Sequence, residues 1–144
     1  MAGELARRTS CRVARVIVLD SGVLIAYLNP ADAHHERVVS FLVEHADEQF
    51  SVATLTLSEC LVHPVRSDQL PIALESLRML ELDVEDMRER DAIPMARLRE
   101  ETRLKMPDAV VLHTAMAFAG SVATTDRALS VAAGRVGVAA QLLV

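Results

Sequence analysis

Aromatic side chains are scarce in this chain of 144 residues: they make up 3% of it, with no tryptophan, one tyrosine and three phenylalanines. A surface that recognises nucleic acid by stacking bases on aromatic rings is therefore nearly excluded. The core must be built from aliphatic side chains and methionine, because hydrophobic residues still make up 51% of the chain and charged residues only 24%. This composition is typical of a globular protein, and the length favours a single domain.

Cysteine is almost as rare, since Cys11 and Cys60 are the only two in the chain. Two thiols cannot form a disulfide framework or a four-cysteine zinc site, and the sequence contains neither a CxxC nor an HExxH motif. It also lacks the GxxxxGK phosphate loop and the GxSxG nucleophile elbow. A reducing cytoplasm is the simplest compartment for such a chain.

Long apolar runs are also missing, because the longest, residues 109–119, contains His113 and is too short to cross a bilayer. We therefore expect no association with a membrane. The net charge is −5, yet the first sixteen residues hold four arginines against one glutamate. We expect residues 1–15 to form a flexible basic tail rather than a secretory signal, and residues 16–144 to form one domain.

Short apolar runs rich in β-branched residues alternate with segments of helical periodicity. We expect strands at 16–19, 50–53, 82–84, 121–124 and 136–138. We expect helices at 23–28, 34–46, 55–62 (ending before Pro64), 88–103 and 126–133, one from Pro107 to near Gly120, and one capped by Asp68 with Ile72, Leu74, Leu77 and Leu80 on its apolar face. This alternation predicts an α/β sandwich with a mainly parallel sheet.

Four acidic residues stand at corresponding places in this pattern. Asp20 ends the first strand, Asp126 follows the strand at 121–124, Glu59 lies in the helix after the second strand, and Asp108 lies in the first turn of a helix. Ligands of open α/β sheets bind at the carboxyl ends of the strands, so these acids can converge there. Carboxylates suit Mg²⁺ or Mn²⁺, which activate water and neutralise phosphate charge in displacement at phosphorus.

Each acid also has a purely structural explanation. Asp20 and Asp126 are placed to cap the helices that follow them, and Asp108 suits the positive end of a helix dipole. Glu59 alone is compatible with a solvated helix face. The joint placement of the four residues, and no single one of them, favours a metal site.

Five segments in order resemble the motifs of the PIN domain family, and in particular its bacterial VapC-type toxins. They are 18–21 (VLDS), 24–28 (LIAYL), 56–62 (TLSECLV), 106–109 (MPDA) and 123–126 (ATTD). Each motif is weak by itself, but their order and spacing are specific. The resemblance covers residues 16–140.

The resemblance implies a three-layer α/β/α fold and a Mg²⁺- or Mn²⁺-dependent endoribonuclease, acting as the toxin of a toxin–antitoxin pair. Asp20, Glu59, Asp108 and Asp126 then form the acidic quartet that binds the metal, with Asp20 and Asp108 as direct ligands. Ser21 matches a position that supports the first aspartate, and Thr125 one that supports the last. An RNA substrate, an antitoxin protein and a second copy of the chain are the partners that this resemblance implies.

Two other functions remain open within the same fold: an RNA-processing nuclease that is not a toxin, and an RNA-binding module that does not cut. Phosphotransfer domains also place an aspartate after the first strand, but Leu19 and Gly22 stand where receiver and dehalogenase-like domains require further acids.

The charged stretch before Asp108 has two readings. Its basic residues are compatible with a solvated helix face, but Arg99, Arg103 and Lys105 lead directly to Asp108 and can contact the RNA backbone. His113, on a mostly apolar helix, is interpreted as a structural histidine.

Overall fold

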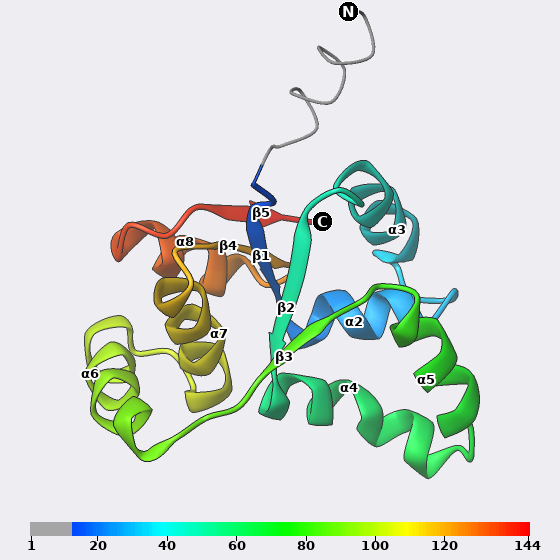
Figure 1. Cartoon of the computed structure of the whole chain (residues 1–144), viewed down its shortest axis with the longest axis horizontal. Helices are drawn as coiled ribbons and strands as arrows, with labels where there is room; N and C mark the ends of the chain where they lie inside the picture. Colours follow the sequence, from blue (N-terminus) through cyan, green and yellow to red (C-terminus); the bar gives the residue numbers. More distant parts are fainter. Residues whose placement is uncertain (1–12) are drawn as a thin grey trace, which may run out of the picture.

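A five-stranded sheet with helices on both sides organises the computed structural model, which describes residues 13–144 (Figure 1). The elements in chain order are β1 (Val16–Leu19), α2 (Ser21–Leu28), α3 (His35–Glu44), β2 (Gln49–Ala53), α4 (Thr54–Arg66), α5 (Leu70–Arg78), β3 (Asp83–Glu85), the 3-10 helix η1 (Glu89–Asp91), α6 (Ala92–Thr102), α7 (Met106–Ala117), β4 (Ser121–Thr124), α8 (Arg127–Arg135) and β5 (Ala140–Leu142). The α/β/α sandwich predicted from the sequence is confirmed.

All neighbouring strands of the sheet are parallel, in the order β3-β2-β1-β4-β5. The first strand is therefore the central one, and Val18 pairs with Ser51 on one side and with Val122 on the other. Because the strands run in the same direction, their carboxyl ends meet at one edge. The sheet order reverses at β1, which is the place where ligands of such sheets bind.

Alternation along β1 divides the core into two layers. Ile17 and Leu19 pack on the face covered by α2, α3, α4 and α5, whereas Val18 packs with α6, α7 and α8 on the other face (Figure 1). Successive side chains of a strand point to opposite faces, so one short run of buried residues serves both layers. The continuous apolar pattern at 16–19 is the sequence signature of this arrangement.

The region between α4 and α5 corrects two expectations. The helix does not stop before Pro64: α4 continues to Arg66, with the buried proline in its last turn. Both the backbone N–H and the hydroxyl of Ser67 donate to the His63 carbonyl at the end of this helix. Asp68 does not cap α5. It has a left-handed φ of 56° and turns the chain, and Gln69 takes the N-cap position without a side-chain bond.

The apolar face expected for α5 is also only partly correct. Ala73 and Leu77 are its buried residues, whereas Ile72 and Leu74 are exposed. The buried face of α5 is therefore narrower than the number of apolar residues in the helix predicts. Apolar side chains therefore remain on its outer surface.

The last strand lies four residues later than expected. At 136–138 the backbone N–H of Val136 still bonds to carbonyls of α8, and Gly137 has a positive φ of 78° that turns the chain. Val138 packs into the core, and pairing with β4 begins only at Ala140. The β-branched residues at 136–138 therefore fill a turn and the core instead of a ladder.

The expected tail at residues 1–15 lies mostly outside the described residues. Of its last three residues, Arg15 accepts a backbone hydrogen bond from Gln49 at 2.8 Å. Among the described helices, none is both long and apolar enough to cross a membrane.

Candidate metal and nuclease site

Asp20 is the buried centre of the carboxyl edge, with 5% of its surface exposed. It follows β1, where its backbone N–H continues the ladder to the Ala123 carbonyl at 3.0 Å, and it caps α2, where the Ser21 N–H donates to Oδ1 at 2.7 Å. Burial raises the pKa of Asp20, and the charge of Asp126 adds to the rise. Hydrogen bonds from Thr124 and Ser21 oppose it.

Thr124 joins two of the expected site residues. Its buried hydroxyl donates to Asp20 Oδ2 at 2.7 Å and accepts the backbone N–H of Asp126 at 2.9 Å. The last residue of β4 thereby fixes the first and the last acids of the quartet relative to each other. Thr124 was not singled out in the sequence, although a hydroxyl at the buried end of a strand next to an aspartate is a signal of this kind.

Asp126 caps α8, because its Oδ1 accepts the Ala128 N–H at 2.8 Å. No hydrogen bond from Thr125 to Asp126 occurs within residues 13–144. The Thr125 side chain instead lies where a side chain at Gly22 would stand, beside Asp20. A Cβ at position 22 would collide with the Thr125 hydroxyl unless that side chain moved, so the end of β4 lies close to the first turn of α2. The hydrogen bond to Asp126 that was expected from Thr125 is made by the Thr124 hydroxyl, which accepts from the Asp126 backbone N–H.

Among the four acids of the site, Asp108 has the most strongly shifted pKa. It is half-buried in the first turn of α7, and its pKa is raised to about 6. Burial is the main cause, followed by the negative charges of Asp20, Asp126 and Glu59, while Lys105 acts in the opposite direction. A helix N-terminus alone lowers the pKa of an aspartate, so desolvation and like charge dominate here.

Glu59 completes the set from α4. It is half-buried, and its pKa is raised by burial and then by the charge of Asp20. The charges of the other three acids thus all contribute to the raised pKa of Asp108 at the carboxyl edge. Within residues 13–144, however, no three His, Cys, Asp or Glu side chains stand close enough together to hold a metal ion directly.

The donor chemistry of this edge suits a hard divalent cation that keeps some of its waters, because such an ion needs few direct carboxylate ligands. Thr56 has a buried hydroxyl whose hydrogen-bonding capacity is not used by the described residues. Its buried Oγ1, one turn before Glu59 on α4, has no hydrogen-bond partner among the described residues. Buried hydroxyls are normally satisfied, by ordered water where protein is absent.

Comparison with known proteins identifies the family. The sequence model of the PIN domain matches residues 17–135, which is most of the chain. The chain belongs to the PIN domain family. No curated protein matches it in sequence.

Solved structures share the fold of this PIN domain at low sequence identity. A chain of VapBC2 from Rickettsia felis, bound to a DNA fragment from its promoter, has a TM-score of 0.68 and 13% identity, covering 88% of this chain and 98% of the other. A toxin–antitoxin complex from Klebsiella pneumoniae has a TM-score of 0.65 and 22% identity, with coverage of 76% and 86%. The toxin VapC20 of Mycobacterium tuberculosis, described as cleaving the sarcin-ricin loop, has a TM-score of 0.59 and 14% identity, with coverage of 81% and 94%.

The basic residues expected to contact RNA differ in their relation to the acids of this PIN domain. Lys105, at the N-cap of α7, lowers the pKa of Asp108 by its charge. Arg103 has a left-handed φ of 61° at the end of α6 and lies 3.6 Å from Glu100 in an exposed ion pair. Arg99 is exposed in the last turn of α6. Lys105 is thus the one whose charge reaches the acid edge.

His113 has the structural role expected for it. Its Nε2 lies 2.8 Å from Asp91 Oδ1, and this pair connects α7 to η1. The hydrogen bond from His113 is the main reason why the pKa of Asp91 is lowered.

Proposed function

We propose that this PIN domain is a Mg²⁺- or Mn²⁺-dependent endoribonuclease. The observation that carries the proposal lies at the switch point of the sheet, where the charges of Asp20, Asp126 and Glu59 all raise the pKa of Asp108. Among the described residues, Lys105 is the one cation that acts in the opposite direction. Such repulsion lowers stability, so it is expected where the acids serve a bound cation. A phosphodiester of RNA is the substrate, and we place the activity in the cytoplasm.

Asp20 and Asp108 are the residues that would hold the cation directly, with Glu59 and Asp126 acting directly or through water. Bound there, a divalent cation would supply activation of water and neutralisation of charge on the phosphate. The protein contributes orientation: Thr124 and Ser21 fix the Asp20 carboxylate, and the N-terminus of α8 fixes Asp126. The raised pKa of Asp108 also allows it to hold a proton near neutral pH when no cation is bound.

A cleavage assay on single-stranded RNA tests the activity. Cleavage is expected with Mg²⁺ or Mn²⁺, with products that carry a 5′-phosphate and a 3′-hydroxyl. Cleavage that persists in EDTA, or a 2′,3′-cyclic phosphate product, would contradict the mechanism. Binding of RNA without any cleavage under all metal conditions would favour the RNA-binding module instead.

We further propose that the nuclease is the toxin of a toxin–antitoxin pair. The support is the fold, shared with chains of complexes described as toxin–antitoxin assemblies. A short neighbouring gene whose product binds this chain and stops cleavage is the expected antitoxin. An RNA-processing enzyme would have no such neighbour, and its expression would leave growth unchanged.

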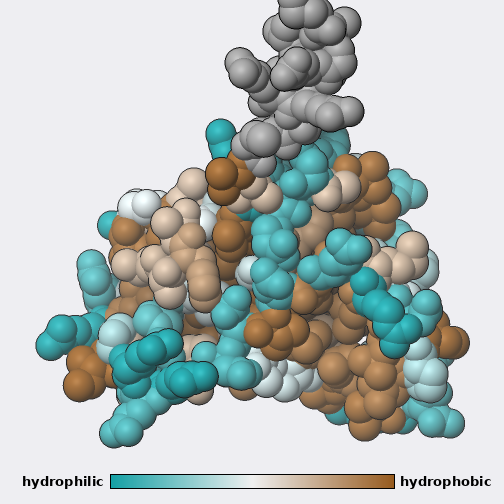
Figure 2. Space-filling view, in the orientation of Figure 1, coloured by the Kyte–Doolittle hydropathy of each residue, from teal (hydrophilic) through white to brown (hydrophobic). Residues whose placement is uncertain are grey.

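A homodimer is the assembly that we propose for the chain. Apolar side chains gather over α4 and α5 on the face shown in Figure 2. Val65 on α4, Leu74 on α5 and Met79 at the end of α5 are exposed, Met79 by 78%. Burial of such side chains drives association. Light scattering should give twice the chain mass, and a Met79→Glu variant should shift it toward the monomer.

A further inference from the structure

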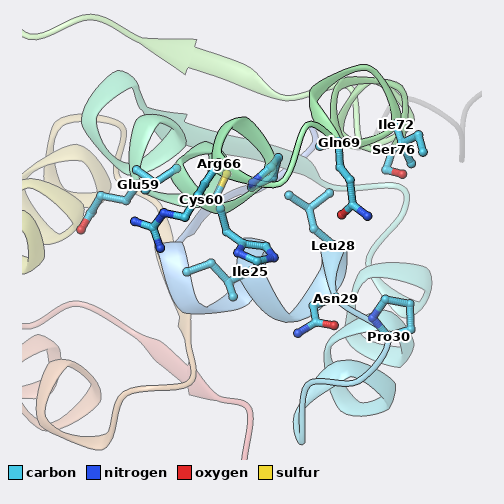
Figure 3. A pocket seen from close by; sticks show the side chains of 14 residues that line it. Ile25, Leu28, Asn29, Pro30, Glu59, Cys60, Arg66, Gln69, Ile72 and Ser76 are labelled. Carbon is cyan, nitrogen blue, oxygen red and sulfur yellow. The ribbon is translucent and has the colours of Figure 1, made fainter.

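A pocket of about 600 Å³ lies beside the acid edge, between α2, α4 and α5 (Figure 3). Its apolar lining includes Ile25, Leu28, Cys60 and Ala73, and Glu59 is part of the wall at one end. The pocket is therefore continuous with the acidic quartet. Its volume is in the range of small-molecule and nucleotide sites.

Three exposed side chains of the pocket, Arg66, Gln69 and Asn29, offer hydrogen-bond donors to a ligand. Arg66 forms no ion pair within residues 13–144, and the amide NH₂ groups of Gln69 and Asn29 have no acceptor there. The oxygens of both amides are engaged, Gln69 by the Ser67 hydroxyl at 3.5 Å and Asn29 by the Ala31 N–H at 3.1 Å. The pocket therefore combines an apolar lining with exposed donors at its rim.

These groups are arranged in order from the acid edge. In Figure 3, Glu59 lies at one end, Arg66 extends its guanidinium toward that end, and Gln69 and Asn29 lie farther away on either side of Leu28. Arg66 follows Glu59 by two helical turns, about 10 Å along the axis, and helical side chains lean toward the N-terminus. The guanidinium therefore points toward the end of the pocket where we expect the scissile phosphate.

We propose that this pocket binds an unpaired nucleotide of the RNA, next to the bond that is cut. The proposal rests on the nuclease function above. Arg66 contacts the phosphate of that nucleotide, its base packs against Ile25 and Leu28, and the amides of Gln69 and Asn29 bind the base edge. Sequence-specific recognition of RNA acts on unpaired bases of this kind, and a guanidinium or an aliphatic wall replaces the scarce aromatic rings.

A nucleotide fits the pocket better than a protein segment does. The unpaired charge at Arg66 matches a phosphate, and the open end leads to carboxylates that are expected to bind a cation with another phosphate. Two amides on an apolar floor match the flat, polar-edged shape of a base. The residues that we assign to the homodimer, Val65, Leu74 and Met79, do not line the pocket.

Binding of short oligoadenylate, oligocytidylate and oligouridylate, measured by fluorescence anisotropy, tests the pocket separately from cleavage. The parent chain carries Asp108→Asn, so that it does not cut. We expect its affinities for the three oligonucleotides to differ by about tenfold, the effect of one well-placed hydrogen bond. Gln69→Ala or Asn29→Ala should reduce this ratio to about twofold or less, whereas Arg66→Ala should weaken all three to a similar degree.

Arg37→Ala is the matched control, because Arg37 is an exposed arginine on α3 that does not line the pocket. It should retain both the affinity and the preference of the parent. Equal affinities in the parent, or a preference that survives all three pocket variants, would overturn the proposal. If the wild-type chain cuts no RNA but the preference exists and is lost in the pocket variants, the pocket stands and the nuclease function fails.

Discussion

Two aspartates, Asp108 in the first turn of α7 and Asp91 in η1 beside the same helix, have pKa values shifted in opposite directions. Near the start of α7, Asp108 is half-buried among other acids and its pKa is raised to about 6. Five residues later on the same helix, His113 reaches across to Asp91, and this contact lowers the pKa of the aspartate. The carboxylate of Asp91 thus has the partner that Asp108 lacks.

This difference is the one expected between a structural carboxylate and one that binds a ligand. A pair such as Asp91 with His113 connects two elements, and its charge is compensated within the protein. Lys105 stabilises the charged form of Asp108, but burial and the negative charges of three other acids destabilise it more and raise the pKa. Carboxylates that are left uncompensated in this way are expected where a ligand supplies the missing charge.

Substitution of each aspartate by asparagine gives the largest contrast. Asp108→Asn should reduce RNA cleavage by about 100-fold or more, because it removes a proposed metal ligand. It should also stabilise the protein in EDTA by about 1 kcal/mol, with less gain in Mg²⁺. Asp91→Asn should retain cleavage and lower the melting temperature. Assays of cleavage and melting decide the point, and an Asp108→Asn variant that cuts RNA at the normal rate would remove this residue from the site.

The two threonines that follow one another in the chain offer a second contrast. Thr124→Val removes the bridge between Asp20 and Asp126, and it should lower stability by about 1–3 kcal/mol because two polar groups lose their partner. Cleavage should fall by about 10-fold or more through the misplaced carboxylate. Thr125→Val is the matched control and should have a smaller effect on both. Urea unfolding measures the stability of both variants, and single-turnover cleavage measures their activity. Equal losses in Thr124→Val and Thr125→Val would show that the hydrogen bonds of Thr124 have no special role.

The pH dependence of stability should have opposite signs for the two aspartates. The raised pKa of Asp108 stabilises the fold below about pH 4, and this contribution is lost as the pH rises through about 6. The lowered pKa of Asp91 stabilises the fold above about pH 4 and is lost as the pH falls. Urea unfolding in EDTA should therefore show a loss of about 1 kcal/mol between pH 4 and pH 7 that Asp108→Asn reduces, while Asp20 and Glu59, whose pKa values are also raised, account for the remainder. A loss of the same size in both proteins would assign it to other groups.

The smallest effect is expected from Lys105. Lys105→Ala removes the one cation that lowers the pKa of Asp108, so the pH profile of cleavage should move slightly upward. The rate with RNA should fall by about threefold, the size of a screened surface interaction. Arg103→Ala is the comparison, because Arg103 already lies beside Glu100. If the two variants have the same profile, Lys105 has no special relation to Asp108.

The positions of the four acids were predictable because they depend on a local rule. Each follows a strand or begins a helix, and parallel strands bring such places to one edge. The choice between Thr124 and Thr125 was not predictable in this way. It depends on the pairing of Leu19 with Ala123, which sets the side of the sheet edge on which each hydroxyl lies. That pairing joins residues far apart in the chain, and no local pattern records it.

The errors at 136–138 and at Pro64 have a common physical cause. In both places local propensity was followed, and tertiary packing had the larger effect. Val138 is needed in the core and Pro64 is buried in the last turn of α4, so burial outweighs β-branching in one and the missing N–H in the other.

The bond from Thr124 to Asp20 joins residues 104 positions apart, and this separation has a consequence during synthesis on the ribosome. Chains are made from the N-terminus, and each can fold only what has emerged. A nascent chain that lacks β4 has the first acid of the quartet but neither its hydroxyl partner nor Asp126. The acid edge is therefore assembled last, and a truncated product released before that point carries no complete site.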